Sequence, residues 1–128
     1  MQKQLDQFRQ FFSEGKFQEK IRRFAKSLGS RTVYTIYLLY YAYHRKGTPA
    51  WAKRIVLGTL GYLIMPIDAI PDLGFLIGFT DDIGVLSFGL VTIAGYVNDE
   101  VRQQAREKVS QLFPGINEED FAAVEKKL

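Results

Sequence analysis

The sequence has no cysteine and only one histidine, His44. The lack of cysteine excludes disulfides, thiolate-bound zinc and cysteine nucleophiles, and it leaves the redox compartment open because periplasmic proteins can also lack cysteine. One histidine offers almost nothing for histidine-based catalysis or metal binding. The first 20 residues are polar and lack a cleavage site, so we predict no signal peptide and a cytoplasmic amino terminus. These absences point away from an enzyme with a resident cofactor.

Basic residues are missing from the middle of the chain. Residues 55–97 contain no Lys or Arg and four Asp, whereas residues 1–54 carry 12 basic and three acidic side chains, and residues 98–128 carry five and seven. Such asymmetry is typical of contact with an anionic surface. Nucleic acid is not the expected partner, because the sequence shows no helix-turn-helix or aromatic-platform motif.

The chain is long enough for one domain with a modest core. It has 128 residues, of which 47% are hydrophobic, and no low-complexity tract. We predict an all-α fold: a small helical bundle built around a central helical hairpin with an Asp/Pro-rich turn, flanked by amphipathic helices. Within it we distinguish a basic, tyrosine-rich helical arm (1–47), the hairpin (48–113) and a short carboxyl-terminal helix (114–128).

The amino-terminal arm has the stripe of an amphipathic helix. Apolar residues recur at three- and four-residue steps from Leu5 to Leu28, with basic residues between them, and Gly15 divides the pattern. Such a helix either lies in a membrane interface or packs on a small core, and both interpretations stay open here. The residues expected to contact anionic lipid or a protein partner are Lys16, Lys20, Arg22, Arg23 and Lys26.

The next stretch, 32–43, contains five tyrosines. It predicts either a core helix or a helix at a partly hydrated boundary, such as a lipid headgroup region or a protein interface. After it, Thr48 is the expected N-cap of a helix with Pro49 at its first position. Residues 55–65 are apolar on nearly every face, and Pro66 is expected to end or kink this helix. The three/four spacing then predicts one continuous helix over 82–113, and Asn117 is expected to cap a final helix.

Neither apolar segment is long enough for a simple membrane span, which needs roughly 20 residues. A helical hairpin is still able to insert, with its Asp-rich turn at the far interface and Lys53, Arg54, Arg102 and Arg106 on the cytoplasmic side. Glycines on both helices would then permit close packing; these are Gly58, Gly61, Gly84, Gly89 and Gly95. The alternative is a soluble bundle whose hairpin is wrapped by the amphipathic arms.

Four aspartates lie in an otherwise apolar stretch: Asp68, Asp72, Asp81 and Asp82. Burying them carries a desolvation cost unless it is compensated. The carboxylates either cap helices and brace the turn, or hold a divalent cation such as Mg²⁺ or Ca²⁺, or share a proton. The spacing matches no EF-hand loop.

These aspartates belong to a longer pattern. It consists of Trp51-Ala-Lys53, then Gly61-Tyr62-Leu-Ile-Met-Pro66-Ile-Asp68-Ala-Ile-Pro71-Asp72, then Gly78-Phe-Thr-Asp81-Asp82. The pattern resembles the YkvA-like family, a domain of unknown function numbered 1232, over roughly residues 48–97. The resemblance implies a small bacterial helical protein of a kind often predicted to be membrane-associated, in a family that also supplies the membrane-embedded part of some eukaryotic ubiquitin ligases. It brings no reaction, and Leu73-Gly74 departs from the bulkier residue and proline that many relatives carry.

Three functions follow as hypotheses. The first is a membrane-associated, non-enzymatic helical module at the bacterial inner membrane or its cytoplasmic face, with a basic arm for anionic lipid or a protein partner. The second is a carboxylate cluster that binds a cation or relays protons. The third is a soluble homo-oligomeric adaptor that hides its apolar hairpin in an interface.

Overall fold

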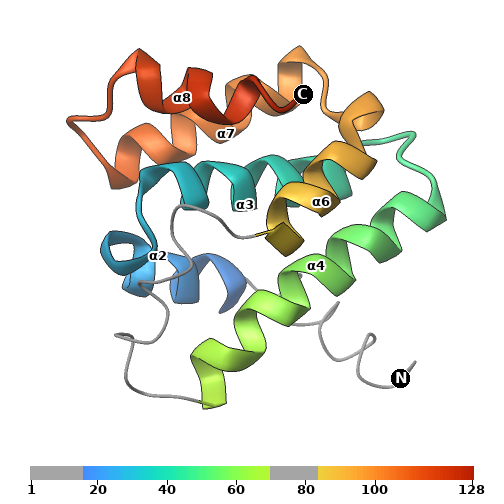
Figure 1. Cartoon of the computed structure of the whole chain (residues 1–128), viewed down its shortest axis with the longest axis horizontal. Helices are drawn as coiled ribbons and strands as arrows, with labels where there is room; N and C mark the ends of the chain where they lie inside the picture. Colours follow the sequence, from blue (N-terminus) through green and yellow to red (C-terminus); the bar gives the residue numbers. More distant parts are fainter. Residues whose placement is uncertain (1–15, 70–83) are drawn as a thin grey trace.

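The computed structural model describes residues 16–69 and 84–128 of the chain. Within them the protein is all-α, as predicted, with no strand (Figure 1). The elements are α2 (Lys16–Leu28), α3 (Ser30–His44), α4 (Ala50–Ala69), α6 (Gly84–Thr92), the 3-10 turn η1 (Ala94–Tyr96), α7 (Asp99–Leu112) and α8 (Glu118–Glu125).

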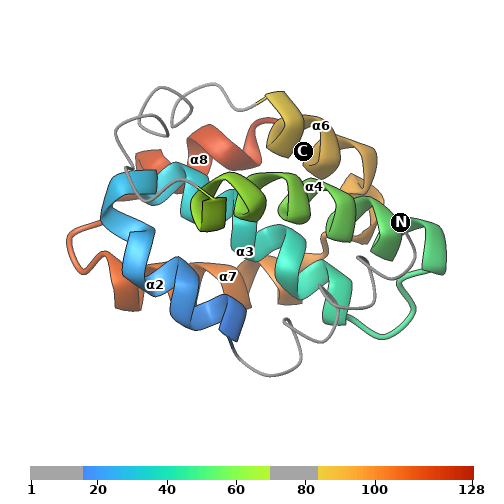
Figure 2. The same cartoon turned by 90° about the horizontal axis from the view of Figure 1, so that it is seen from below.

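The tyrosine-rich helix α3 lies at the centre of the bundle. It contacts α2, α4, α6, α7 and α8, and Figures 1 and 2 show these helices arranged around it. Tyr34 and Tyr37 are fully buried, and Tyr40 and Tyr43 nearly so. The core interpretation of this stretch is therefore confirmed, because its aromatic rings fill the interior.

Helix α2 packs its apolar stripe on α3. Phe17 and Ile21 are fully buried, and the Phe17 ring stacks on Tyr40 with the ring centroids 5.1 Å apart. The described part of the stripe is thus occupied by the core and does not face a membrane interface. The predicted stripe from Leu5 to Gly15 lies outside the described residues.

Helix α4 differs from its prediction at both ends. The Thr48 hydroxyl donates to the Ala42 carbonyl at 2.7 Å, so Thr48 closes the end of α3 and does not cap α4, which begins after Pro49. At the other end the helix continues through Pro66 to Ala69. Pro66 therefore does not end the helix, and the expected kink at this proline stays a prediction.

The prediction of one continuous helix over 82–113 was wrong. α6 ends at Thr92, η1 follows, and α7 begins after Asn98. The Asn98 side chain accepts a hydrogen bond from the Val101 backbone N–H at 2.9 Å, which satisfies a donor that a new helix would leave unpaired. The apolar spacing continues across this break because Val97 and Val101 both point into the same core.

Polar contacts fix the carboxyl-terminal helix α8 on α3 and α7. Asn117 caps it as predicted, by accepting from the Asp120 N–H at 3.2 Å. The Arg106 guanidinium of α7 pairs with Glu118 and Glu125 and lies over the Phe121 ring, 4.7 Å from its centroid. α8 is therefore held by charge as well as by apolar packing.

Helices α4 and α6 contact each other and run in opposite directions (Figures 1 and 2). They are in close contact at Gly89, where an added Cβ would lie 2.5 Å from Thr59 Oγ1. Added Cβ atoms at Gly58, Gly61 and Gly95 would meet nothing within 4 Å, so these three do not serve close packing among the described residues. The turn that would join the two helices into the predicted hairpin lies outside the described residues.

Candidate functional site

The outward face of α6 is apolar. Val85, Phe88 and Val91 are 38%, 68% and 53% exposed, while Leu86 and Leu90 on the opposite face are buried. The sequence from Gly84 to Val97 contains no charged residue. A helix at the surface of a globular protein ordinarily turns charged or polar side chains outward, so this face departs from the usual pattern.

The other described helices follow the usual pattern. α2 exposes Arg22, Arg23 and Lys26, and α7 exposes Glu100 and other polar side chains. The apolar exposure is therefore a local property of α6 and its surroundings.

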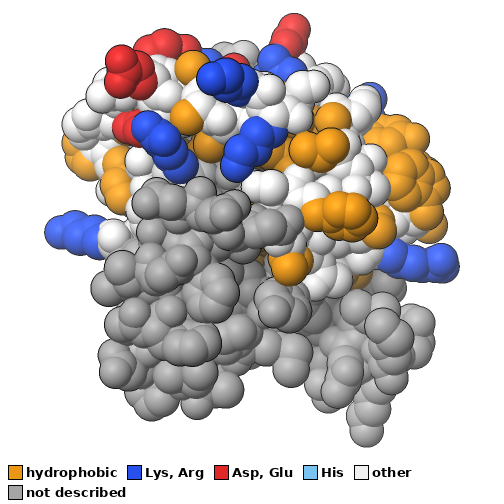
Figure 3. Space-filling model, in the orientation of Figure 1, with side chains coloured by type: hydrophobic (Ala, Val, Ile, Leu, Met, Phe, Trp, Pro, Cys, Tyr) orange, Lys and Arg blue, Asp and Glu red, His pale blue; other side chains and the backbone are white. Residues whose placement is uncertain are grey.

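One more exposed aromatic side chain extends this surface. Trp51, in the first turn of α4, is 48% exposed and packs edge-on against Tyr96 with the ring centroids 5.7 Å apart. We call Trp51, Val85, Phe88 and Val91 the apolar patch. Figure 3 shows apolar side chains gathered over α6 and the start of α4, with basic side chains nearby.

Basic side chains border α6 and the start of α4. Arg54 is exposed one turn after Trp51. The Lys127 ammonium, from the end of the chain, donates to the Ser87 hydroxyl of α6 at 3.0 Å. The patch thus combines an apolar centre with cations near its rim.

The structure does not describe the side chains of the four aspartates that were predicted to bind a cation. Asp68 lies on α4, but its side chain is not among those described, and Asp72, Asp81 and Asp82 lie outside the described residues. Among the side chains that are described, no three His, Asp or Glu come together as a metal site. The cation and proton hypotheses therefore stay predictions.

The predicted signature residues are only partly placed. Gly61 is half-buried on α4, and Tyr62 and Pro66 follow it on the same helix, although their side chains are not described. Pro71 and Gly78 lie outside the described residues.

The predicted lipid contacts all lie on α2. Arg22, Arg23 and Lys26 are exposed, Lys20 is half-buried, and Lys16 is the first residue of the helix. In Figure 2, α3 lies between α2 and α6. Helix α2, which carries the predicted lipid contacts, is therefore not the neighbour of the helix that carries most of the apolar patch.

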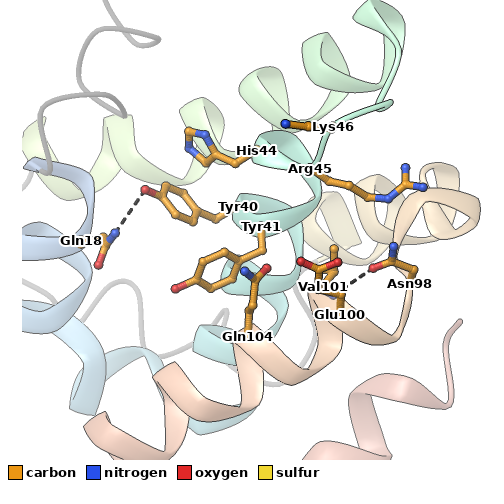
Figure 4. A pocket seen from close by; sticks show the side chains of 10 residues that line it. All are labelled: Gln18, Tyr40, Tyr41, His44, Arg45, Lys46, Asn98, Glu100, Val101 and Gln104. Atoms are coloured by element: carbon orange, nitrogen blue, oxygen red, sulfur yellow. Dashed lines mark hydrogen bonds between the residues drawn. The ribbon is translucent and has the colours of Figure 1, made fainter.

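A polar groove lies between α2, α3 and the first turns of α7 (Figure 4). Its volume is about 620 Å³. At one end Gln18 Nε2 donates to the Tyr40 hydroxyl at 3.2 Å. Burial, and then the charge of nearby Lys53, lower the pKa of His44 below its ordinary value. His44 is the last residue of α3, and the groove beside it was not predicted from the sequence.

No membrane-crossing helix was found. Within residues 16–69 and 84–128, no helix combines the length and the apolar character that a crossing requires.

The fold and these surfaces define a small all-α protein with an unusual apolar face. The model of a family described as "Protein of unknown function (DUF1232)" matches residues 52–88. This confirms the resemblance drawn from the proline and aspartate pattern, and the matched segment runs from the first turns of α4 into α6. The match covers less than a third of the chain. Neither the curated proteins nor the solved structures contain a match.

The apolar patch was missed by sequence reasoning. An apolar helix without charges predicts burial on all sides, and the sequence does not say which of its faces a neighbour covers. The only signal was the spacing of Val85, Phe88 and Val91, which places them on one side of a helix.

Proposed function

We propose that this protein is a non-enzymatic helical module that attaches to the surface of an anionic membrane through the apolar patch. The observation that carries the proposal is an exposed helical face without a single charged residue. Contiguous exposed apolar surface on a folded domain marks a place of interaction, because leaving it in water is unfavourable.

The composition of the rim favours a bilayer over a protein as the occupant. Trp51 and Tyr96 are aromatic side chains of the kind that settle at the level of lipid headgroups. Arg54 and Lys127 add cations, each contributing about 1 kcal/mol near an anionic surface. The attachment is peripheral, and the site we propose for it is the cytoplasmic face of the bacterial inner membrane.

Vesicle sedimentation tests this proposal. The full chain is mixed with vesicles of phosphatidylglycerol and phosphatidylcholine, or of phosphatidylcholine alone, at low and high salt. We expect sedimentation with the anionic vesicles, weakened by salt. Phe88→Ser is expected to weaken it about thirtyfold, because burying a phenyl side chain contributes roughly 2 kcal/mol.

The matched control changes the other basic surface. Arg22→Gln with Arg23→Gln removes two exposed cations of α2 and leaves the apolar patch intact. If this variant loses sedimentation and Phe88→Ser keeps it, the bilayer contact lies on α2 and the proposal is wrong. A stable dimer that Phe88→Ser dissociates, without vesicle binding, would instead assign the patch to a second copy of the chain.

A further inference from the structure

The polar groove has the size of a small-molecule site. Its volume of about 620 Å³ lies within the range of roughly 300–1,000 Å³ that such sites occupy. Three helices and the loop after α3 build it, so it is formed by the fold as a whole. In Figure 4, Gln18 lies at one end, and Arg45 and Asn98 lie at the other.

Two cationic side chains, Arg45 and Lys46, line the groove. Within the described part of the chain, neither Arg45 nor Lys46 forms an ion pair or a side-chain hydrogen bond. Arg31 and Arg106, by contrast, are both paired with carboxylates of α8. One carboxylate, Glu100, also lines the groove, which leaves an excess of positive charge.

Uncharged hydrogen-bonding groups line the rest of it. Gln104 and the Tyr41 hydroxyl make no hydrogen bond within the described residues, and Asn98 uses only its carbonyl oxygen, to cap α7. Amide and hydroxyl groups of this kind match the hydroxyls of a polar ligand, because both partners donate and accept.

We propose that this groove binds a small phosphate ester of a polyol, with the phosphate held by Arg45 and attracted by the charge of Lys46, and the hydroxyls held by Asn98, Gln104 and Tyr41. The planar guanidinium of Arg45 presents paired donors to phosphate oxygens, and Lys46 adds a point charge. The ester is either a free metabolite or the headgroup of a phospholipid. This proposal does not depend on the apolar patch.

Titration of the ¹⁵N-labelled full chain with glycerol 3-phosphate tests it. We expect saturable shifts confined to the amides of residues 44–47 and 98–104. Inorganic phosphate is expected to bind more weakly because it lacks the polyol hydroxyls. Glycerol is expected not to bind because it lacks the phosphate. Gln104→Leu is expected to reduce the preference for the ester over inorganic phosphate.

Charge variants with a matched control decide the role of the cations. Arg45→Gln with Lys46→Gln is expected to weaken binding about tenfold, through the loss of two charge-assisted contacts. Arg23→Gln with Lys26→Gln removes the same charge from α2 and is expected to change nothing. Shifts that do not saturate, that sodium chloride reproduces at equal ionic strength, or that both variants lose equally would overturn the proposal.

Vesicles distinguish the two sources of the ester. If the Arg45/Lys46 variant also loses sedimentation with vesicles that contain phosphatidic acid, the occupant is a lipid headgroup, and if it keeps sedimentation, the occupant is a free ester. Phe88→Ser is expected to retain glycerol 3-phosphate binding in either case. The membrane proposal for the apolar patch and the ligand proposal for the groove can therefore be refuted independently.

Discussion

At the scale of single residues, two buried tyrosines of α3 differ in whether their hydroxyl is hydrogen-bonded. The Tyr34 hydroxyl donates to Glu125 Oε2 at 3.0 Å, whereas the buried Tyr37 hydroxyl has no hydrogen-bond partner within the described residues. Tyr34→Phe is therefore expected to lower the free energy of unfolding by about 1 kcal/mol. Tyr37→Phe is expected to leave it unchanged or raise it, and urea unfolding measures both. Equal losses in the two variants would contradict this explanation.

Tyr34 also predicts how stability depends on pH. Burial, and then the hydrogen bond to Glu125, raise the pKa of Tyr34 from 10.0 to about 12. The unfolded chain therefore loses this proton first, so the stabilisation is complete below pH 10 and is lost as the pH rises toward 12. The pKa of Tyr37 is raised as well, chiefly by burial. Unfolding experiments from pH 9 to 12 should show that the free energy of unfolding declines with pH, and less steeply in Tyr34→Phe. An equally steep decline in this variant would contradict the role given to the hydrogen bond between Tyr34 and Glu125.

Gly89 is required by the contact between α4 and α6. A Cβ there would lie 2.5 Å from Thr59 Oγ1 and 2.9 Å from Thr59 Cγ2, and Thr59 is buried. Gly89→Ala is expected to destabilise the protein by roughly 1–3 kcal/mol. Gly58→Ala meets no atom and is expected to stabilise α4 by about 0.5–1 kcal/mol. Thermal unfolding compares the two, and Thr59→Ala should relieve part of the Gly89→Ala loss.

At the scale of elements, the break between α6 and α7 depends on a helix cap. Asn98→Ala removes the acceptor for the Val101 N–H and is expected to cost about 1 kcal/mol of stability, whereas Asn98→Asp keeps an acceptor and should cost little. Urea unfolding of the two variants, with helical content followed by circular dichroism, is the measurement. If both variants lose stability equally, the cap is not what starts α7.

The elements show what a sequence can and cannot predict. Buried stripes such as Phe17 and Ile21, and caps such as Asn117, act locally, and so the helices they define were predicted. The break at Asn98 was missed although its cap and the acidic residues after it are local signals, because the apolar period continues through it. The exposure of α6 was unpredictable, since it depends on where neighbouring helices end.

At the scale of the whole molecule, the charge asymmetry of the sequence becomes a spatial one. Helix α2, which carries the basic residues, and helix α6, which carries most of the apolar patch, lie on different sides of α3 (Figure 2). An amphipathic helix can offer its apolar face to a core or to lipid, but not to both. Because α2 gives that face to the core, the bilayer contact that we propose depends, within the described residues, on the apolar patch.

This arrangement makes Trp51 a reporter of how the molecule sits on a membrane. Trp51 is the sole tryptophan of the chain and is half-exposed within the apolar patch. If the patch meets the bilayer, anionic vesicles are expected to shift the Trp51 emission to the blue and to protect it from a water-soluble quencher, because the indole leaves water. Phe88→Ser should reduce both effects, and Arg22→Gln with Arg23→Gln should preserve them. Vesicle binding that leaves the emission of Trp51 unchanged would place the bilayer against a different face, because an attached patch cannot keep its indole in water.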